Sequence, residues 1–193
     1  FADEIIVLDS GSTDDTVSIC KEFTEKVYET DWPGFGPQKN RALAKASGDW
    51  VLSIDADEVI TEEGQHEILA AIKQPVAGAY ALIRHSYYCG RFMKFGDWRN
   101  DYVIRLFQKN QAQFSSDVVH ERVIVQGKIA KLKQPMLHYS FLNPAQVLEK
   151  MNHYSTLSAK QKQERGKKAS LMTAITHGVW TFIKGYFLSL VFL

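Results

Sequence analysis

The sequence predicts an α/β fold for the first half of the chain, and three observations lead to this prediction. Short apolar runs typical of buried parallel strands occur at residues 4–8, 27–28 and 50–54. Segments with helical spacing of apolar residues separate these runs. Polar and acidic residues follow the first and third runs, where strands of an open sheet end at the ligand-binding edge. This alternation predicts a parallel sheet covered by helices.

The helices of the first half are delimited by turn and cap residues. Residues 30–37 contain two glycines and two prolines, which indicates a loop before the second helix. Residues 47–49 end that helix, and Thr61 opens the third. The predicted helices lie at about 17–23, 38–46 and 62–73.

The pattern changes after Pro75, where strands replace the strand–helix alternation. The stretch 90–101 is expected to be a loop, and from Asn143, with Pro144 at the first helical position, the chain turns helical, with Gly166 as a candidate break. The predicted strands lie at 79–88, 103–107, 122–125 and 135–140.

Charge is distributed unevenly along a chain whose net charge is +1. Residues 1–74 hold 16 Asp and Glu against 6 Lys and Arg, whereas residues 75–193 hold 6 against 17. The acidic composition of residues 1–74 suits binding of a metal ion, and the basic composition of residues 75–193 suits binding of phosphates or of an anionic membrane. The small net charge and the lack of a recognisable nucleic-acid-binding motif disfavour nucleic-acid binding. Two cysteines exclude a disulfide-stapled scaffold and a four-cysteine zinc site.

The run DSGSTDDT at residues 9–16 is the first candidate site. Asp9 can accept from a ribose hydroxyl or a base N–H, and Gly11 allows close approach of a ligand. Ser12 is a further candidate binding residue, and the helix start that follows offers N–H groups. The alternative is a plain strand–helix turn capped by Asp14 or Thr13.

Three carboxylates in four residues form the second candidate, at Asp55, Asp57 and Glu58. Like charges this close repel one another unless a cation lies among them. Carboxylate oxygens suit Mg²⁺ or Mn²⁺, whose coordination a diphosphate would complete. The alternative is an acidic turn exposed to water.

Two further segments carry candidate residues. Lys39 and Arg41 lie near a helix start and can reach a phosphate, although a solvated helix face is the alternative, favoured for Arg41. His120 and Glu121 form a pair that can serve as a general base or help to place a metal, and alone such a pair is more often structural.

Together these motifs resemble those of family 2 inverting glycosyltransferases. The resemblance rests on DEIIVLDSGSTDDT at 3–16, GFGPQKN at 34–40 and GDWVLSIDADE at 48–58, in the family's order. More narrowly, RLF at 105–107 followed by VHE at 119–121 resembles the bacterial lipopolysaccharide-core branch, which adds glucose to inner-core heptose.

The resemblance implies a GT-A fold, with a Rossmann-like nucleotide-binding half and an acceptor-binding half over residues 1–142. It implies that Asp9 contacts the uracil or ribose, that Asp55 lies against the ribose, and that Asp57 binds the metal bridging the diphosphate. Glu121 falls at the position of the catalytic base, with Asp117 in reserve because the family usually pairs Glu with Asp there. Lys39 or Arg105 is expected to assist the leaving group.

The family normally begins with an earlier strand and helix that line the nucleotide pocket. This unit is missing before Phe1, so we expect the chain to be a fragment with an incomplete donor site.

Residues 143–193 are expected to form a helical tail that associates with a membrane. Residues 149–184 carry a net charge of +5, and from Leu171 onward only Lys184 is charged. An amphipathic helix lying on an anionic inner membrane is the preferred interpretation. A helix packing on another part of the protein and a true membrane span are the alternatives.

The sequence therefore predicts a metal-dependent inverting hexosyltransferase. Its expected partners are a UDP-sugar, a lipid-linked oligosaccharide acceptor and the cytoplasmic face of the inner membrane, with Mg²⁺ or Mn²⁺ as cofactor. The competing hypotheses are a sugar-nucleotide-binding protein without turnover and a metal-dependent phosphotransfer enzyme.

Overall fold

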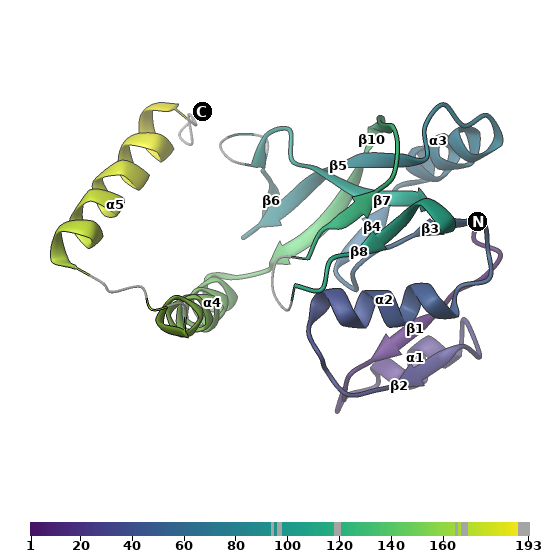
Figure 1. The fold of residues 1–193 in the computed structure, drawn as a ribbon, viewed down its shortest axis with the longest axis horizontal. Coiled ribbons are helices and arrows are strands. Elements are labelled where there is room, and N and C mark those ends of the chain that lie inside the picture. Colours follow the sequence, from purple (N-terminus) through teal and green to yellow (C-terminus); the bar gives the residue numbers. More distant parts are fainter. Residues whose placement is uncertain (94, 96–97, 118–120, 165, 167–169, 189–193) are drawn as a thin grey trace. The chain divides into compact units, whose positions relative to one another are not determined.

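The computed structural model describes residues 1–193 except 94, 96–97, 118–120, 165, 167–169 and 189–193 (Figure 1). In chain order the elements are β1 (Val7–Asp9), α1 (Thr16–Lys21), β2 (Val27–Glu29), α2 (Phe35–Lys45), β3 (Trp50–Leu52), β4 (Glu58–Ile60), α3 (Glu62–Lys73), β5 (Ala79–Tyr88), β6 (Arg91–Phe92), β7 (Tyr102–Gln108), β8 (Ala112–Phe114), β9 (Val123–Val125), β10 (Ile129–Phe141), α4 (Pro144–Glu164) and α5 (Leu171–Ile183). A 3-10 turn covers Lys109–Gln111, and a π-helical turn covers Lys184–Leu188.

The strands confirm the α/β class, but the prediction of a parallel sheet is wrong beyond the first pair. β1 and β2 are parallel, with Val7 opposite Val27. The larger sheet of the described residues has the order β3-β7-β5-β10-β4, with β6 beside β5. In it β7 runs antiparallel to β3, and β10 runs antiparallel to β4. Apolar runs locate strands, but the partner of β3 comes from more than fifty residues away, which the local pattern does not encode.

Three of the predicted elements start three or more residues away from the expected position. The first strand is Val7–Asp9 instead of residues 4–8. Helix α2 begins at Phe35, inside the expected loop, because Pro37 is tolerated in the first helical turn, where its missing N–H has no intrahelical partner. β10 starts at Ile129 and not at 135, and the Glu67 carboxylate of α3 accepts N–H bonds from Lys133 and Gln134 in its added part.

The chain divides into two compact units that share strands β5 and β10. Unit 1 consists of residues 1–54, 61–82 and 102–134, and unit 2 consists of residues 55–60, 83–101 and 135–193. The buried core of unit 1 contains Ala79, Phe107 and Phe114, against which Val51 and Ile104 pack. The predicted domain boundary after residue 142 stays a prediction.

Helices α4 and α5 belong to unit 2, and the predicted start of the helical tail and its break at Gly166 are confirmed. The Asn143 side chain accepts the N–H of Gln146, so it caps α4, and Pro144 is its first residue. Gly166 lies beyond the end of α4 with a φ of 68°, a conformation that favours glycine. The Ser170 side chain caps α5 by accepting the N–H of Thr173. Within the described part of the chain, no helix has the length and apolar content needed to cross a membrane.

Helix α2 approaches the segment 114–117 of unit 1 so closely that Gly36 has no room for a side chain. A Cβ atom on Gly36 would lie 2.0 Å from the carbonyl oxygen of Ser115 and 2.9 Å from that of Asp117. The Gly36 N–H donates to the Asp117 carbonyl at 3.1 Å. The glycine is therefore needed for space.

Substituting Gly36→Ala is expected to destabilise the chain by about 1–3 kcal/mol, because backbone must move to admit the methyl group. In a helix with room for the methyl group, the same change would raise the free energy of unfolding by about 0.5–1 kcal/mol. The sign of the measured change therefore distinguishes the two cases. Denaturant unfolding measures the difference. The control is Gly48→Ala, whose Cβ would meet only the Trp50 carbonyl, at an ordinary 3.5 Å. Equal or higher stability of the Gly36 variant would contradict the packing argument.

Candidate functional site

The loop after β1 is built around the Asp9 carboxylate. Asp9 Oδ2 accepts the N–H groups of Gly11 and Ser12, both at 2.9 Å, and Oδ1 accepts the Ser12 hydroxyl. These bonds, the Ser12 hydroxyl first, lower the pKa of Asp9 below its usual range. Gly11 has a φ of 96°, which the tight loop requires. The predicted donor-binding residues of this loop therefore form one rigid turn.

The start of α1 gives a mixed result for the predicted caps. Asp15 holds the N-cap position without a side-chain bond, and the Asp14 carboxylate accepts the N–H of Thr16 at 3.1 Å. Asp14 thus stabilises the turn as the alternative interpretation foresaw, while Asp9 organises the preceding loop.

Helix α2 presents the QKN residues of its first turns to different neighbours in unit 1. Gln38 donates to the hydroxyls of Ser10 and Thr30, at 2.8 and 2.7 Å. Asn40 pairs with the backbone of Phe114, donating to its carbonyl at 2.8 Å and accepting its N–H at 2.9 Å. The motif therefore holds the Asp9 loop and the strand β8 to the same helix.

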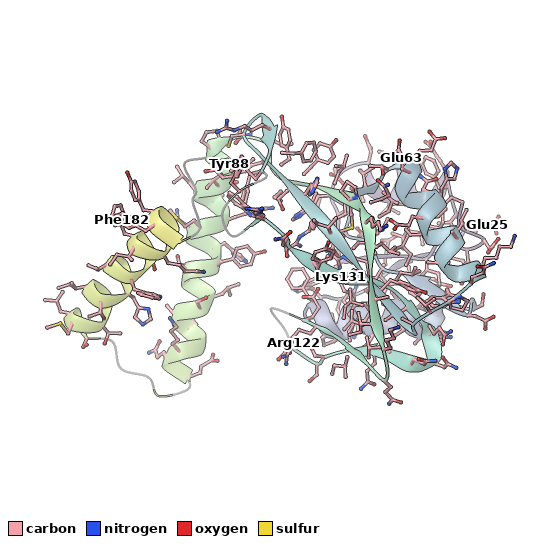
Figure 2. The ribbon with its side chains drawn as sticks, turned by 90° about the horizontal axis from the view of Figure 1, so that it is seen from above. Glu25, Glu63, Tyr88, Arg122, Lys131 and Phe182 are labelled. Atoms are coloured by element: carbon pink, nitrogen blue, oxygen red, sulfur yellow. The ribbon has the colours of Figure 1, made fainter. Side chains whose placement is uncertain are left out.

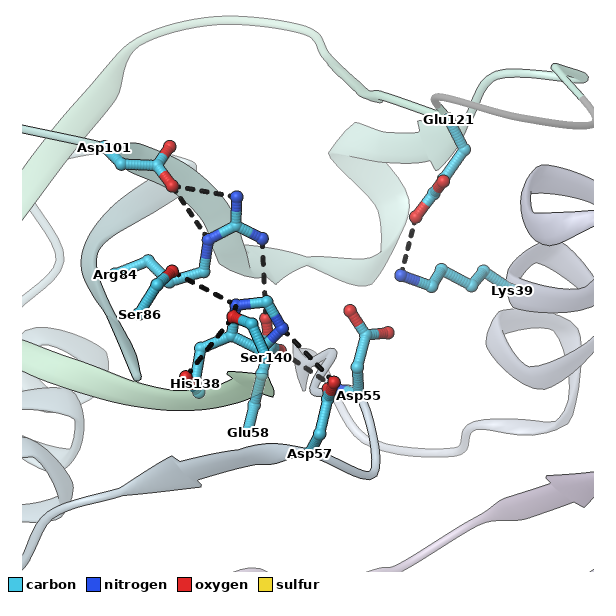
Figure 3. Close-up of polar contacts among 10 residues, drawn as sticks. All are labelled: Lys39, Asp55, Asp57, Glu58, Arg84, Ser86, Asp101, Glu121, His138 and Ser140. Atoms are coloured by element: carbon cyan, nitrogen blue, oxygen red, sulfur yellow. Dashed lines mark hydrogen bonds and ion pairs between the residues drawn. The ribbon is translucent and has the colours of Figure 1, made fainter. Parts of the chain in front are cut away.

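Lys39 and Glu121, both predicted site residues, contact each other in unit 1. The Lys39 ammonium lies 2.7 Å from Glu121 Oε1, and the two side chains are only 15% and 18% exposed (Figure 3). Arg41 instead pairs with Asp31 on the exposed face of the helix, as its alternative interpretation predicted. The structure thus brings Lys39, the candidate phosphate ligand, into contact with Glu121, the candidate base. Their separation in the sequence gave no sign of this contact.

The acidic corner of unit 2 does not group its three carboxylates. Glu58 turns inward, where its Oε2 accepts the N–H of Asp55 at 2.9 Å and its Oε1 lies 4.0 Å from the Arg84 guanidinium. Arg84 also pairs with Asp101, at 2.8 Å. Glu58 is the first residue of β4 and is fully buried, so it lies apart from Asp57, whose role as a metal ligand stays a prediction.

Asp57 remains at the surface of unit 2, where its side chain is 40% exposed and faces His138 (Figure 3). His138 Nε2 lies 3.3 Å from Asp57 Oδ2. The hydrogen bond from His138 is the main cause that lowers the pKa of Asp57, although partial burial opposes it. A half-exposed carboxylate offers the hard oxygen donor that Mg²⁺ or Mn²⁺ takes, so Asp57 fits a metal that a diphosphate also binds.

His138 is a residue that sequence reasoning missed. It lies on β10 opposite Glu58 of β4, and the Tyr139 N–H donates to the Asp57 carbonyl. The available signal was a histidine within the predicted strand 135–140, but its partner Asp57 is 81 positions earlier. Only the strand register brings the two together.

The remaining predicted residues lie as follows. Asp55 is partly buried beside the corner, Arg105 lies on β7 and is 6% exposed, and Asp117 is exposed. His120 lies outside the described residues. Their catalytic and binding roles stay predictions. Among the residues that the structure describes, no group of three His, Cys, Asp or Glu side chains forms a metal-binding cluster.

Comparison with known proteins places these residues in a family context. Residues 1–130 match the family model described as Glycosyl transferase family 2. An uncharacterized glycosyltransferase of Rickettsia typhi is 36% identical over 96% of this chain and 68% of the relative. The lipopolysaccharide core biosynthesis glycosyltransferase LpsC of Rhizobium meliloti is 30% identical over 95% of this chain and 71% of LpsC.

Two solved structures of S. aureus TarS share the fold. The first superposes with a TM-score of 0.51 at 19% identity, covering 71% of this chain and 51% of the TarS chain. The second, a complex with UDP, also has a TM-score of 0.51, at 18% identity, covering 76% and 53%. The chain thus spans about half the length of the TarS chain it matches. The similarity confirms the predicted GT-A-like α/β fold.

Replacing Glu58 by alanine is expected to lower the free energy of unfolding by about 1.5–3 kcal/mol, because the buried carboxylate bonds the Asp55 backbone and faces Arg84. Chemical denaturation measures the loss. The control is Glu25→Ala, an exposed acid whose removal should change stability by less than about 0.5 kcal/mol. Equal effects of the two substitutions would show that Glu58 does not support the corner.

Proposed function

The chain belongs to glycosyl transferase family 2, and from this premise we propose a metal-dependent inverting transfer of a hexose, glucose, from a UDP-sugar to a lipid-linked glycan such as lipopolysaccharide inner core. The relation to LpsC, named for lipopolysaccharide core biosynthesis, supports this acceptor class. The TarS complex with UDP supports a uridine donor. The observation that carries the proposal is that the family match over residues 1–130 includes every predicted donor, metal and base residue.

The donor is proposed to bind first through the Asp9 loop. Its carboxylate is ionised and held in a fixed turn by Gly11 and Ser12. A fixed carboxylate can accept from a base N–H or a ribose hydroxyl without the cost of ordering the loop on binding. Asp55, beside the acidic corner, is proposed to contact the ribose, and Arg105 to assist the diphosphate.

Asp57 is proposed to hold Mg²⁺ or Mn²⁺. When bound, the cation would supply Lewis-acid stabilisation of the charge that develops on the leaving diphosphate. The Glu58 bond to the Asp55 N–H fixes the turn between the two aspartates, so the Asp57 carboxylate is presented on a rigid corner.

Glu121 is proposed to be the general base. It takes the proton from an acceptor hydroxyl while the oxygen attacks the anomeric carbon and UDP leaves with the electron pair of the broken bond, which inverts that carbon. Lys39 holds one carboxylate oxygen at 2.7 Å and so limits the orientations of Glu121. Asp117 remains the alternative base.

The helical tail is proposed to bind the cytoplasmic face of the inner membrane, where a lipid-linked acceptor would be presented. The large apolar side chains of α5 are more than a third exposed, including Phe182 at 63% (Figure 2). No Asp or Glu follows Glu164, and Lys and Arg are frequent around it. Apolar surface with neighbouring cations suits anionic lipid.

Replacing Glu121 by glutamine is expected to lower the transfer rate about 10²–10⁴-fold while UDP-sugar affinity is retained, because the amide cannot accept the proton. Transfer to a glycan acceptor and donor titration by calorimetry give the two quantities. Glu63→Gln, an exposed acid on α3, is the matched control.

A wild-type rate in the Glu121 variant would place the base elsewhere, and loss of transfer in Asp117→Asn alone would place it at Asp117. Donor binding without turnover in the unmodified chain would favour the non-catalytic alternative. Phosphate release from simple phosphate esters would favour the phosphotransfer alternative.

The double variant Val179→Glu and Phe182→Glu is expected to abolish flotation of the full chain with vesicles of phosphatidylcholine and phosphatidylglycerol. Charges on the apolar face oppose insertion. Unmodified chain should float with these vesicles and less with pure phosphatidylcholine.

The matched control replaces Ile19 and Val76, which are 52% and 66% exposed outside the tail, by glutamate. Flotation of the α5 variant to the same extent as the unmodified chain would refute the membrane proposal.

A further inference from the structure

Lys150, on the second turn of helix α4, reaches back to the end of strand β10 within unit 2. Its Nζ donates to the Ser140 carbonyl at 3.0 Å and lies 5.1 Å from the centre of the Phe141 ring. The start of the helix is itself tied to the strand, because the Gln146 side chain accepts the N–H of Leu142 at 2.9 Å. The ammonium group therefore has a defined position at the end of the strand.

A short series of contacts connects this lysine to the acidic corner. Ser140, whose carbonyl bonds Lys150, places its hydroxyl 2.8 Å from His138 Nδ1 (Figure 3). His138 Nε2 lies 3.3 Å from Asp57 Oδ2. The hydrogen bond from His138 is the main cause that lowers the pKa of Asp57, and the charges of His138 and Lys150 add to it. The positive charge of the lysine thus acts where the Asp57 carboxylate is exposed.

The surroundings of Lys150 differ from those of two other lysines. Lys160, on the same helix, is exposed, whereas Lys150 is partly buried. The Lys39 ammonium pairs with Glu121 at 2.7 Å, but among the residues that the structure describes no carboxylate oxygen lies within 4.0 Å of Lys150 Nζ. Of the three N–H donors of an ammonium, one bonds the neutral Ser140 carbonyl. A cation held by a carbonyl and a ring keeps its charge for an anionic ligand.

We propose that the Lys150 ammonium binds the diphosphate of the sugar nucleotide beside the acidic corner. This inference rests on the proposed function, which places the diphosphate on a cation held by Asp57. The sequence predicts Lys39 or Arg105 for this task, whereas the structure pairs Lys39 with Glu121 in unit 1. A positioned ammonium stabilises the negative charge that grows on the diphosphate as it leaves.

Calorimetric titration of the full chain with UDP and with uridine, in the presence of Mn²⁺, tests the assignment. Lys150→Met keeps the length and the apolar stem of the side chain, and it is expected to weaken UDP binding at least about 10-fold. Uridine affinity should stay unchanged, because uridine has no phosphate. Lys150→Arg, which keeps the charge, should lose much less UDP affinity. A merely structural role would lower both affinities alike and would overturn the assignment.

Lys160→Met is the matched control, because it removes the same charge from an exposed position of the same helix. Its UDP affinity should equal that of the unmodified chain. Mn²⁺ binding without UDP gives a second readout. The Lys150 charge opposes a cation at Asp57, so Lys150→Met should bind Mn²⁺ no more weakly than the unmodified chain. Weaker Mn²⁺ binding would mean that the lysine supports the corner structurally, and it would overturn the assignment.

Unchanged UDP affinity in Lys150→Met would overturn the assignment while leaving the transfer proposal intact. In that case a raised KM for the glycan acceptor would assign the ammonium to an anionic group of the acceptor, and weaker flotation with anionic vesicles would assign it to a lipid headgroup. Absence of UDP binding by the unmodified chain would overturn the assignment together with the proposed uridine donor. Loss of transfer in Glu121→Gln, measured separately, reports on the base alone.

Discussion

The first two turns of helix α2 connect two parts of unit 1 through contacts on opposite faces of the helix. Residues 36, 39 and 40 are three and four positions apart, so they lie on one face of the helix, whereas Gln38 lies on the opposite face. The first face contacts Phe114 and Glu121, and Gln38 contacts the loops after β1 and β2. One short motif thus fixes both the donor-loop candidate and the base candidate, and the space left by Gly36 makes the approach possible.

A second constraint operates in unit 2, where β4 and β10 pair in antiparallel register. His138 lies opposite Glu58, so the residue just before β4, Asp57, lies beside Tyr139 and close to the histidine ring. Glu58, the first residue of β4, is buried against Arg84, whereas Asp57, in the turn before the strand, reaches the surface. Because Glu58 is buried beside Arg84 and Asp57 is exposed beside His138, each carboxylate has its own cationic or hydrogen-bonding partner. This separation reduces the repulsion expected among three neighbouring acids.

These two arrangements supply different chemistry from groups that are already in place. Unit 1 pairs the Glu121 carboxylate with the Lys39 ammonium, and unit 2 pairs the Asp57 carboxylate with the His138 imidazole. Membership of glycosyl transferase family 2 is the reason that we propose roles in sugar transfer for Lys39, Glu121 and Asp57. The exposed apolar side chains of α5 are the observation on which the membrane proposal rests.

The sequence by itself determined the α/β class, most of the helices and the motifs that identify the family. It could do so because apolar periodicity, the Asn143 cap and the acidic run are local signals. The strand partners, the inward turn of Glu58 and the Lys39–Glu121 and Asp57–His138 contacts were decided by tertiary structure alone. Each of these contacts joins residues about 80 positions apart, or depends on a strand register that a local pattern does not specify.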